Sequence, residues 1–373
     1  MHVLHMIDGL SIGGAEMLLI TFASQARLHG MKMTVIGLQN DQDTPIIHSL
    51  KELGVHIEIF PDEHLFSLRR IIKIIRFIKS EKFDLMQTHL TYANVLGGLA
   101  GWFAGVPVIA TLHSTREGSR PNYLRNKIEL LTIKYLTKRV VAVGQSVADA
   151  YRSQLGNKRL EVIRNAVLPP QVLSISERQS LRNEFSIDLS SQVIIAVGRI
   201  AASKGYSDLI SAFSPIHSRY SKVSLLIIGS GDLSDKIKNQ VSDLQLDEVV
   251  HFLGERNDIT RCLAASDIFV SSSHWEGLPL AVLEAMMAGL PIVATAVGDL
   301  PQVVTPEIGL TVPPHNPQQL SEALLTLLAH PELRREMGKA AQKKAIREYS
   351  AAAWFQKIMN SYSEVLHRAP GAY

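Results

Sequence analysis

The fold is decided by the stretch SSSHWEGLPLAVLEAMMAGLP, residues 271–291. An apolar run at 267–273 leads into it and has the length of a buried strand. A short turn with an acid, a glycine and a proline follows, and then a helix-forming run at 280–288 that ends at Gly289. We therefore predict a strand–loop–helix unit, in which the helix N-terminus directs backbone N–H groups into the loop, where proteins bind phosphate.

Two carboxylates, Glu276 and Glu284, lie eight residues apart around this loop. A helix N-terminus attracts anions, whereas a carboxylate repels them. If the loop binds a phosphate, the balancing positive charge must therefore come from elsewhere in the chain.

Short apolar runs alternate with helix-length amphipathic segments along the rest of the chain. This alternation predicts right-handed βαβ crossovers and parallel sheets that are covered on both faces. The pattern lapses at 162–182, where Pro169–Pro170 indicate a domain boundary, and then restarts. The expected strands are 3–8, 33–38, 56–60, 84–89, 108–113 and 140–144 before the lapse, and 193–199, 224–231, 249–254, 267–273, 291–297 and 309–313 after it.

The chain has 373 residues, more than one core usually accommodates, so we predict two open α/β domains. Ligands of open parallel sheets bind at the carboxyl ends of the strands, and we expect the two sheets to face each other across one cleft. The segment 331–367 is helical with a break near Tyr349–Ser350, so the final helix can pack elsewhere.

The composition excludes several classes of protein. A hydrophobic content of 46% with 20% charged residues is typical of a soluble globular protein, and a net charge of +3 is too small to indicate a nucleic-acid partner. The single cysteine, Cys262, excludes an internal disulfide framework and is consistent with a reducing compartment. We find no signal peptide and no apolar run of about 18 residues, and we expect a cytoplasmic protein.

Three glycines, Gly9, Gly13 and Gly14, separate the first strand from a helix that begins near Ala15. They allow either the close approach of an anion to the helix N-terminus or a flexible turn, and the glycines alone do not decide between the two. The GxGxxG pattern is absent, which argues against a dinucleotide.

Two histidines, His89 and His113, end the fourth and fifth expected strands. A lone histidine at a strand end usually has a structural role, but two at the same edge of one sheet favour a functional one. Neither has the spacing to a cysteine or a second histidine that a metal site requires. We therefore expect them to contribute hydrogen bonds or a positioned charge.

Two basic residues follow the first strand of the second domain. Arg199 leaves the strand and Lys204 lies just before the next helix. A planar guanidinium fork and a compact ammonium suit a diphosphate, although such a pair is solvated surface about as often. With the helix N-terminus at Pro279 they would complete an anion cage. GxxxxGK[ST] does not occur, so this is not a P-loop.

The helix expected at 66–80 places Arg69, Lys73 and Arg76 on one face and isoleucines on the other. A solvated basic face on a helix that covers the sheet explains this pattern. The alternative is a peripheral contact with anionic lipid headgroups, worth about 1 kcal/mol per basic residue near the surface.

Five motifs, taken together, resemble retaining glycosyltransferase family 4, whose members have the GT-B architecture of two facing Rossmann-like domains. They occur in family order and span the chain, and the last is the most specific: GGAE (13–16), VIRNAV (162–167), VGRIAASKG (197–205), GSGD (229–232) and HWEGLPLAVLEAMMAGLPIVAT (274–295). The resemblance implies an N-terminal acceptor-side domain at 1–168, a C-terminal nucleotide-sugar domain at 169–351, and a final helix at about 352–373 that packs on the first domain. The chain departs from many relatives at Asp299, where they have glycine.

The resemblance also assigns roles to individual residues. Arg199 and Lys204 would neutralise the donor diphosphate, and Glu284 would hold the ribose hydroxyls. Glu276 would contact hydroxyls of the donor sugar, with the backbone near Gly277 and Leu278 positioning the sugar and phosphate. From the first domain, Gly14 would lie at the diphosphate, His113 at the reacting face of the sugar, and His89 on the acceptor side.

The expected activity is metal-independent transfer of a hexosyl or N-acetylhexosaminyl group, with retention, in cell-surface polysaccharide biosynthesis. We expect a UDP-sugar donor first and GDP-mannose second, a glycan or lipid-linked glycan acceptor, and no cofactor. The alternatives are a noncatalytic protein that binds sugar nucleotides and, since Rossmann-like sheets also bind NAD, an NAD-dependent oxidoreductase.

Overall fold

The computed structural model describes residues 1–11, 13–62, 67–114, 123–156, 158–169 and 173–367. The chain forms two compact units. Unit 1 comprises Met1–Ala166 and Ala351–Tyr373, and unit 2 comprises Val167–Ser350. The boundaries predicted from the sequence follow residues 168 and 351. Where the chain passes from unit 1 to unit 2 and back, Val167 donates its N–H to the carbonyl of Tyr349 at 3.0 Å.

Unit 1 contains a seven-stranded sheet in the order β3-β2-β1-β4-β5-β6-β7, and all its paired strands are parallel. The order reverses direction between β1 and β4. The strands are β1 (His2–Ile7), β2 (Lys32–Gly37), β3 (His56–Ile59), β4 (Leu85–His89), β5 (Val108–Leu112), β6 (Arg139–Ala142) and β7 (Leu160–Val162).

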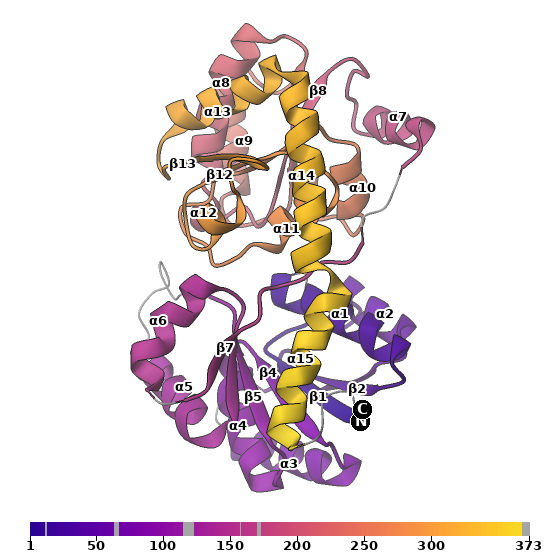
Figure 1. Cartoon of the computed structure of the whole chain (residues 1–373), viewed down its shortest axis with the longest axis vertical. Helices are drawn as coiled ribbons and strands as arrows, with labels where there is room; N and C mark the ends of the chain where they lie inside the picture. The colour runs from indigo at the N-terminus through magenta and orange to yellow at the C-terminus, as the bar shows by residue number, and fades with distance from the viewer. Residues whose placement is uncertain (12, 63–66, 115–122, 157, 170–172, 368–373) are drawn as a thin grey trace. The chain divides into compact units, whose positions relative to one another are not determined.

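Helices cover both faces of this sheet, and the last helix of the chain is one of them (Figure 1). On one face, Leu4, Met6 and Met86 pack in an apolar cluster with residues of α3 and α4. On the other face α15 lies beside α1, where Phe22 contacts the ring of Tyr362 with centroids 6.0 Å apart. The helices are α1 (Gly14–Leu28), α2 (Pro45–Glu52), α3 (Leu68–Glu81), α4 (Thr91–Ala104), α5 (Tyr123–Leu136), α6 (Gln145–Leu155) and α15 (Ala351–Leu366).

Unit 2 repeats this architecture with six parallel strands in the order β10-β9-β8-β11-β12-β13, and its order reverses between β8 and β11. The strands are β8 (Gln192–Val197), β9 (Val223–Ile228), β10 (Val250–Gly254), β11 (Ile268–Ser271), β12 (Ile292–Thr295) and β13 (Gly309–Val312). The helices are α7 (Ile175–Glu184), the 3-10 turn η1 (Ala202–Lys204), α8 (Tyr206–Arg219), α9 (Ser234–Asp243), α10 (Ile259–Ala264), α11 (Leu280–Met287), α12 (Leu300–Val303), α13 (Pro317–Ala329) and α14 (Pro331–Tyr349).

The predicted fold class, two Rossmann-like α/β domains with parallel sheets, is confirmed. All twelve predicted strands are present, but the interpretation of 162–182 as a simple lapse was wrong. It hides the end of β7, which is only three residues long, and the polar helix α7. Helix α7 begins with a capping box, in which Ser174 and Glu177 bond each other's backbone.

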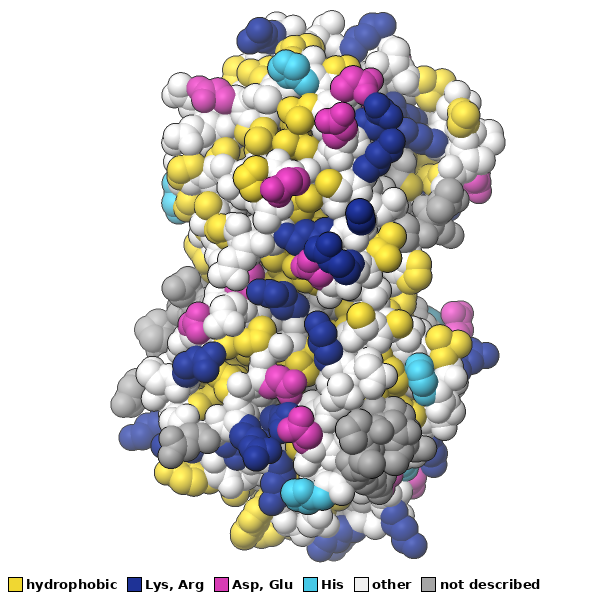
Figure 2. All heavy atoms as spheres, viewed as in Figure 1, with side chains coloured by type: hydrophobic (Ala, Val, Ile, Leu, Met, Phe, Trp, Pro, Cys, Tyr) yellow, Lys and Arg dark blue, Asp and Glu magenta, His cyan; other side chains and the backbone are white. Residues whose placement is uncertain are grey.

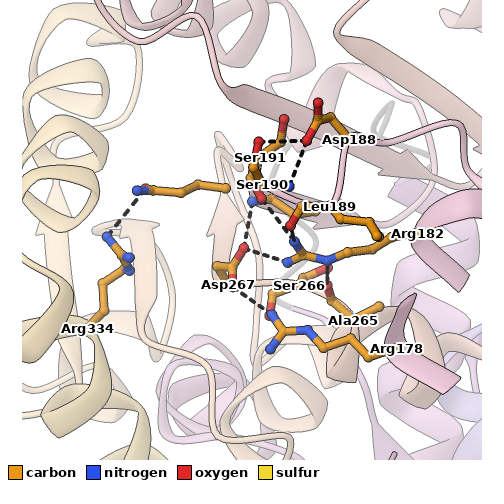
Figure 3. Close-up of polar contacts among 12 residues, drawn as sticks. Arg178, Arg182, Asp188, Leu189, Ser190, Ser191, Ala265, Ser266, Asp267 and Arg334 are labelled. Carbon is orange, nitrogen blue, oxygen red and sulfur yellow. Dashed lines mark hydrogen bonds and ion pairs between the residues drawn. The ribbon is translucent and has the colours of Figure 1, made fainter. Parts of the chain in front are cut away.

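Helix α7 buries only Leu181 among its apolar residues, and an ion cluster also holds it (Figure 3). Arg182 is buried and bonds Asp267 at 2.8 Å, while Arg178 bonds the other oxygen of Asp267 at 2.6 Å. Arg182 also donates to the carbonyls of Ala265 and Ser191. The Asp267 carboxylate accepts the N–H of Val193 as well, so this cluster joins α7 to the amino ends of β8 and β11.

No helix within the described ranges is long and apolar enough to cross a membrane.

Candidate functional site

The predicted site residues follow the strands next to the point where each sheet reverses its strand order. Open α/β sheets bind their ligands at such reversal points, beyond the carboxyl ends of the strands. In unit 1, His89 ends β4 and His113 follows the neighbouring β5. In unit 2, Arg199 and Lys204 follow β8, and Glu276, Gly277 and Leu278 follow β11.

In unit 2, the loop after β8 is fastened to the loop after β11. Gly205 has φ +61°, and a Cβ there would lie 2.0 Å from the carbonyl oxygen of Ser272, so no other residue fits. Ser272 donates its hydroxyl to the carbonyl of Lys204 at 2.8 Å, and His274 donates its N–H to Ser203 at 2.7 Å. The backbone of Lys204 is thereby fixed against the loop that carries Glu276.

Lys204 and Glu276 form an ion pair between Nζ and Oε1. Both side chains are mostly buried, with exposed fractions of 22% and 16%. Ser273 donates to the same carboxylate oxygen at 3.3 Å, and Lys204 also lies over Gly198, where a Cβ would come within 3.2 Å of Cε. An ammonium has three N–H donors, so the pair leaves Lys204 able to bind a further anion.

A third loop, after β12, closes on the same segment. Gly298 has φ +55°, and a Cβ there would lie 2.3 Å from the carbonyl oxygen of Glu276. Asp299 donates its N–H to the carbonyl of Gly277 at 3.0 Å, and its side chain is fully buried. Leu278 is also buried and packs in the core, which anchors the loop. The side chain that replaces the family glycine at Asp299 therefore points into the protein rather than toward a ligand.

Glu284 lies on α11, which begins at Leu280 after Pro279 in the N-cap position, as the sequence indicated. Apolar residues on the rest of α11, among them Val282 and Met286, are buried and fix the helix. The Glu284 side chain is half-buried, and burial raises its pKa to about 7. Near neutral pH this carboxyl group can therefore donate as well as accept hydrogen bonds, which suits a contact with hydroxyls.

Arg199 is the predicted cage residue that the structure does not bring into contact with the others. Its side chain is exposed, and within the described part of the chain it forms no ion pair. The structure joins Lys204, Glu276 and the glycine-rich turns, and leaves Arg199 at their margin.

One cluster that the sequence analysis did not single out lies beside Lys204. His274 Nε2 bonds Asp208 Oδ2 at 2.9 Å, and His315 Nδ1 lies 4.0 Å from the same oxygen. Among the described residues this is the group whose ligand atoms could hold a metal. The shorter distance is that of a direct hydrogen bond, so His274 and Asp208 already satisfy each other. Their spacing of 66 residues left no local signal in the sequence.

In unit 1, α1 begins at the exposed Gly14, and its N-cap Gly13 provides no side-chain cap. Glu16 folds back over this turn, because a Cβ on Gly13 would lie 2.4 Å from its Oε2. Burial raises the pKa of Glu16 to about 7 and that of Asp8 to about 6, and Asp8 accepts the N–H of Ala93 at the start of α4. Glu16 is therefore only partly ionised near neutral pH, and it repels an anion less than a fully charged carboxylate would.

The two predicted histidines bond each other and a third histidine that the sequence analysis did not single out. His89 Nδ1 lies 3.1 Å from His113 Nε2, and His89 Nε2 lies 3.0 Å from His5 Nδ1. His89 is only 4% exposed, and both its ring nitrogens are occupied. The ring therefore has no polar atom left for a ligand, in contrast to the acceptor-side role expected for it.

Burial sets the protonation of these three histidines. It lowers the pKa of His5 to about 3, that of His113 to about 4, and that of His89 well below the usual value. All three rings are therefore neutral near pH 7, which leaves hydrogen bonding, not a positioned charge, as the contribution of His113.

The sequence matches two family models, one over each half of the chain. "Glycosyltransferase Family 4" matches residues 12–169, and "Glycosyl transferases group 1" matches residues 177–344. The chain belongs to glycosyltransferase family 4, and its fold is GT-B.

Individual relatives agree with this assignment. The N-acetyl-alpha-D-glucosaminyl L-malate synthase of Bacillus anthracis is 25% identical over 81% of this chain and 79% of its own length. A UDP-Gal:alpha-D-GlcNAc-diphosphoundecaprenol alpha-1,3-galactosyltransferase of Escherichia coli is 29% identical over 61% of this chain, and the match spans 62% of that enzyme. The crystal structure of HepE from Anabaena in complex with UDP-glucose has a similar fold, with a TM-score of 0.88, 23% identity and coverage of 98% of this chain and 100% of that one.

Proposed function

We propose that this protein transfers a sugar from a nucleotide-sugar, with a UDP-sugar preferred over GDP-mannose, to a glycan or lipid-linked glycan acceptor with retention of configuration. The pathway would be cell-surface polysaccharide biosynthesis. The observation that carries the proposal is Lys204, held by its backbone at the strand-order reversal of unit 2 and paired with Glu276. The names of the similar galactosyltransferase and of the HepE complex support a UDP-sugar as the donor.

The reaction explains why these groups are needed. Cleavage of the sugar–phosphate bond develops negative charge on the departing diphosphate and positive charge on the sugar. The Lys204 ammonium, the Arg199 guanidinium and the N-terminus of α11 stabilise the leaving group. Glu276 accepts hydrogen bonds from hydroxyls of the sugar, the backbone near Gly277 and Leu278 positions it, and Glu284 holds the ribose hydroxyls.

From unit 1, the family resemblance assigns Gly14 to the diphosphate and His113 to the sugar. The N-terminus of α1 begins at Gly14 without a side-chain cap, which is suitable for an anion. Retention follows if the acceptor attacks the face that the diphosphate leaves, with a phosphate oxygen taking the acceptor's proton.

A panel of UDP-, GDP- and ADP-sugars, scored for slow release of the nucleotide by hydrolysis, tests the donor without knowledge of the acceptor. We expect release from a UDP-sugar by the natural protein and its loss in Lys204→Ala. The anomer of the released sugar, observed by NMR before it mutarotates, tests retention. Tight binding without any release would favour the noncatalytic alternative, and no binding at all would overturn the proposal.

We also propose that the transfer needs no metal, because Lys204 and Arg199 supply the cationic charge. Activity should then survive prolonged dialysis against EDTA. Loss of activity on dialysis, its return with added Zn²⁺ or Mg²⁺, and the absence of that return in His315→Ala would instead identify the Asp208–His274–His315 cluster as a metal site.

We further propose a cytoplasmic location with peripheral contact at the inner face of the membrane through α3. Arg69, Lys73 and Arg76 are exposed on this helix, and Leu68 and Ile72 beside them are exposed apolar side chains. Figure 2 shows Lys and Arg side chains at the edge of unit 1 where α3 runs.

Flotation with vesicles that contain anionic lipid tests this contact. Replacement of the three basic residues of α3 by serine should abolish flotation. Replacement of Lys339, Lys343 and Arg347, three exposed basic residues along α14, should not. Equal flotation of all three proteins would refute membrane contact through α3.

A further inference from the structure

A row of buried polar side chains crosses one face of the unit 1 sheet. His5 of β1 is in register with Gln87 of β4, and His89 of β4 is in register with Thr111 of β5. Because side chains alternate along a strand, His5, Gln87, His89 and Thr111 all point to the same face. The opposite face of these strands carries the apolar cluster with Leu4, Met6 and Met86, and one buried hydroxyl there, that of Thr88, donates to Asn94. Burial of polar side chains costs free energy unless they are hydrogen-bonded, so each side chain of this row requires hydrogen-bond partners.

The row begins on the last helix of the chain. The Tyr362 hydroxyl of α15 contacts Gln87 Oε1 and lies 3.5 Å from His5 Nε2, so it bridges two residues that are neighbours across β1 and β4. Gln87 in turn donates its Nε2–H to the hydroxyl of Thr111 at 2.8 Å. From His5 the row continues through His89 to His113. We call Tyr362, His5, His89 and His113, with Gln87, the histidine chain.

The donors and acceptors in this chain can be assigned one after another. A phenol has a single proton, and burial raises the pKa of Tyr362, so the hydroxyl keeps that proton. The Gln87 carbonyl oxygen can only accept, and it is the closer partner, so the Tyr362 proton goes to Gln87. The hydroxyl oxygen can then only accept from His5, which must carry its proton on Nε2.

Each neutral imidazole has one donor and one acceptor, so the direction propagates along the chain. With its proton on Nε2, His5 accepts at Nδ1 from the Nε2–H of His89. His89 therefore accepts at Nδ1 from the Nε2–H of His113. No described residue bonds His113 Nδ1, which is then an unprotonated nitrogen at the half-buried end of the row.

We propose that the histidine chain holds His113 as the neutral tautomer with its proton on Nε2, so that Nδ1 is presented to the ligand as a hydrogen-bond acceptor. The group it recognises is a hydroxyl donor. If the proposed function holds, this group is a hydroxyl of the donor sugar. His5, His89, Gln87 and Tyr362 are positioning residues that act through His113, and α15 takes part in the site although it lies at the end of the chain.

The direction of the chain allows a test in which two variants give different results. Gln87→Met keeps the shape of the side chain but removes the acceptor for Tyr362. Its proton then turns to His5 Nε2, every bond reverses, and His113 should carry its proton on Nδ1. Tyr362→Phe removes the hydroxyl that sets the direction of the histidine chain, so both tautomers of His113 should be populated. Tyr151→Phe removes a hydroxyl from another buried tyrosine of unit 1 and serves as the control.

The ring nitrogens of ¹⁵N-histidine-labelled protein report the tautomer directly, because protonated and unprotonated nitrogens have well-separated chemical shifts. We expect an unprotonated Nδ1 on His113 in the natural protein and in Tyr151→Phe, the reverse in Gln87→Met, and averaged shifts in Tyr362→Phe. Donor hydrolysis should fall about tenfold in Gln87→Met, the effect of losing one properly paired hydrogen bond, and by about twofold in Tyr362→Phe, where part of the protein keeps the proton of His113 on Nε2.

A proton on Nδ1 of His113 in the natural protein would overturn the proposal, even if a variant failed to fold. Unchanged His113 shifts in both folded variants would overturn it as well. Lys204→Ala separates this proposal from the proposed function, because it should lower donor hydrolysis by about 10²-fold or more without altering the shifts of His113. If no donor is hydrolysed at all, the tautomer measurement still decides whether the chain has the assigned direction.

Discussion

The polar side chains at the strand-order reversals of the two sheets differ in charge. In unit 2, Lys204 and Glu276 form an ion pair between the loops that follow β8 and β11. In unit 1, burial keeps His5, His89 and His113 neutral. The same architecture can thus supply a charge at one edge and a directed hydrogen bond at the other. The difference is that burial lowers the pKa of the three imidazoles, whereas Lys204 and Glu276 contact each other as an ion pair.

The largest expected effect is on the charged edge. Lys204→Ala should lower kcat/KM for the donor by about 10²- to 10³-fold, as expected when a donor to the developing charge is lost. It should also weaken UDP binding, measured by calorimetry, and Lys236→Ala on the exposed face of α9 is the control. If UDP affinity were unaltered in both Lys204→Ala and Glu284→Ala, the anion cage would be refuted.

Glu276→Ala should have the next largest effect, because it removes an acceptor for sugar hydroxyls rather than a contact with phosphate. We expect turnover to fall by about tenfold or more while nucleotide affinity changes less. Glu336→Ala, which removes one exposed carboxylate from α14, is the matched control. Equal losses of turnover and affinity would place Glu276 in ground-state binding.

Glu284 gives a dependence on pH in unit 2. Its pKa of about 7 in the folded protein lies above the unfolded value of 4.5, so the stability it contributes is fully present below pH 4.5 and is lost as the pH rises from 4.5 to about 7. The stability of Glu284→Gln relative to the natural protein should therefore increase by about 2 kcal/mol between pH 5.5 and pH 8.5. Urea unfolding at both pH values measures this difference, and a pH-independent difference would contradict the raised pKa.

The smallest expected effect is that of salt, which should weaken ligand binding at the charged edge of unit 2 but leave the effect of the histidine chain in unit 1 unchanged. Raising NaCl from about 0.05 to 0.5 M should weaken UDP binding by a factor of about three, because a partly exposed ammonium is screened. The fall in donor hydrolysis caused by Tyr362→Phe should be the same at both salt concentrations, because salt does not screen the neutral, buried side chains of the histidine chain. If salt changed the Tyr362→Phe effect as strongly as UDP binding, unit 1 would also act through charge.

The amino edge of unit 2 provides a contrast within one domain. Arg178, Arg182 and Asp267 are bonded to each other and to backbone carbonyls, so their donors are used to hold α7 (Figure 3). Lys204, at the other edge, has one ionic partner and donors to spare. The number of charged residues in the sequence does not distinguish these two clusters. They differ in how many of their N–H donors are already hydrogen-bonded within the protein.

The sequence predicted much of the fold, because strand–helix alternation and the breaks at Gly289 and Ser350 are local signals. It missed β7, whose three residues are too few for a periodic pattern, and α7, which buries a single apolar side chain, Leu181, and is also held by Arg182 and Asp267. It located Lys204 and Glu276 at neighbouring strand ends, but not their ion pair.

The sequence by itself determined the family, the two parallel sheets and the loops in which the chemistry lies, because motifs and periodicity are properties of short segments. Only the tertiary structure decided that His5 and Tyr362, 357 residues apart, meet on one buried row, and that Glu16 and Glu284 have raised pKa values. Burial and the direction of a hydrogen-bond chain arise from atoms that the fold brings together, and no local pattern of residues encodes them.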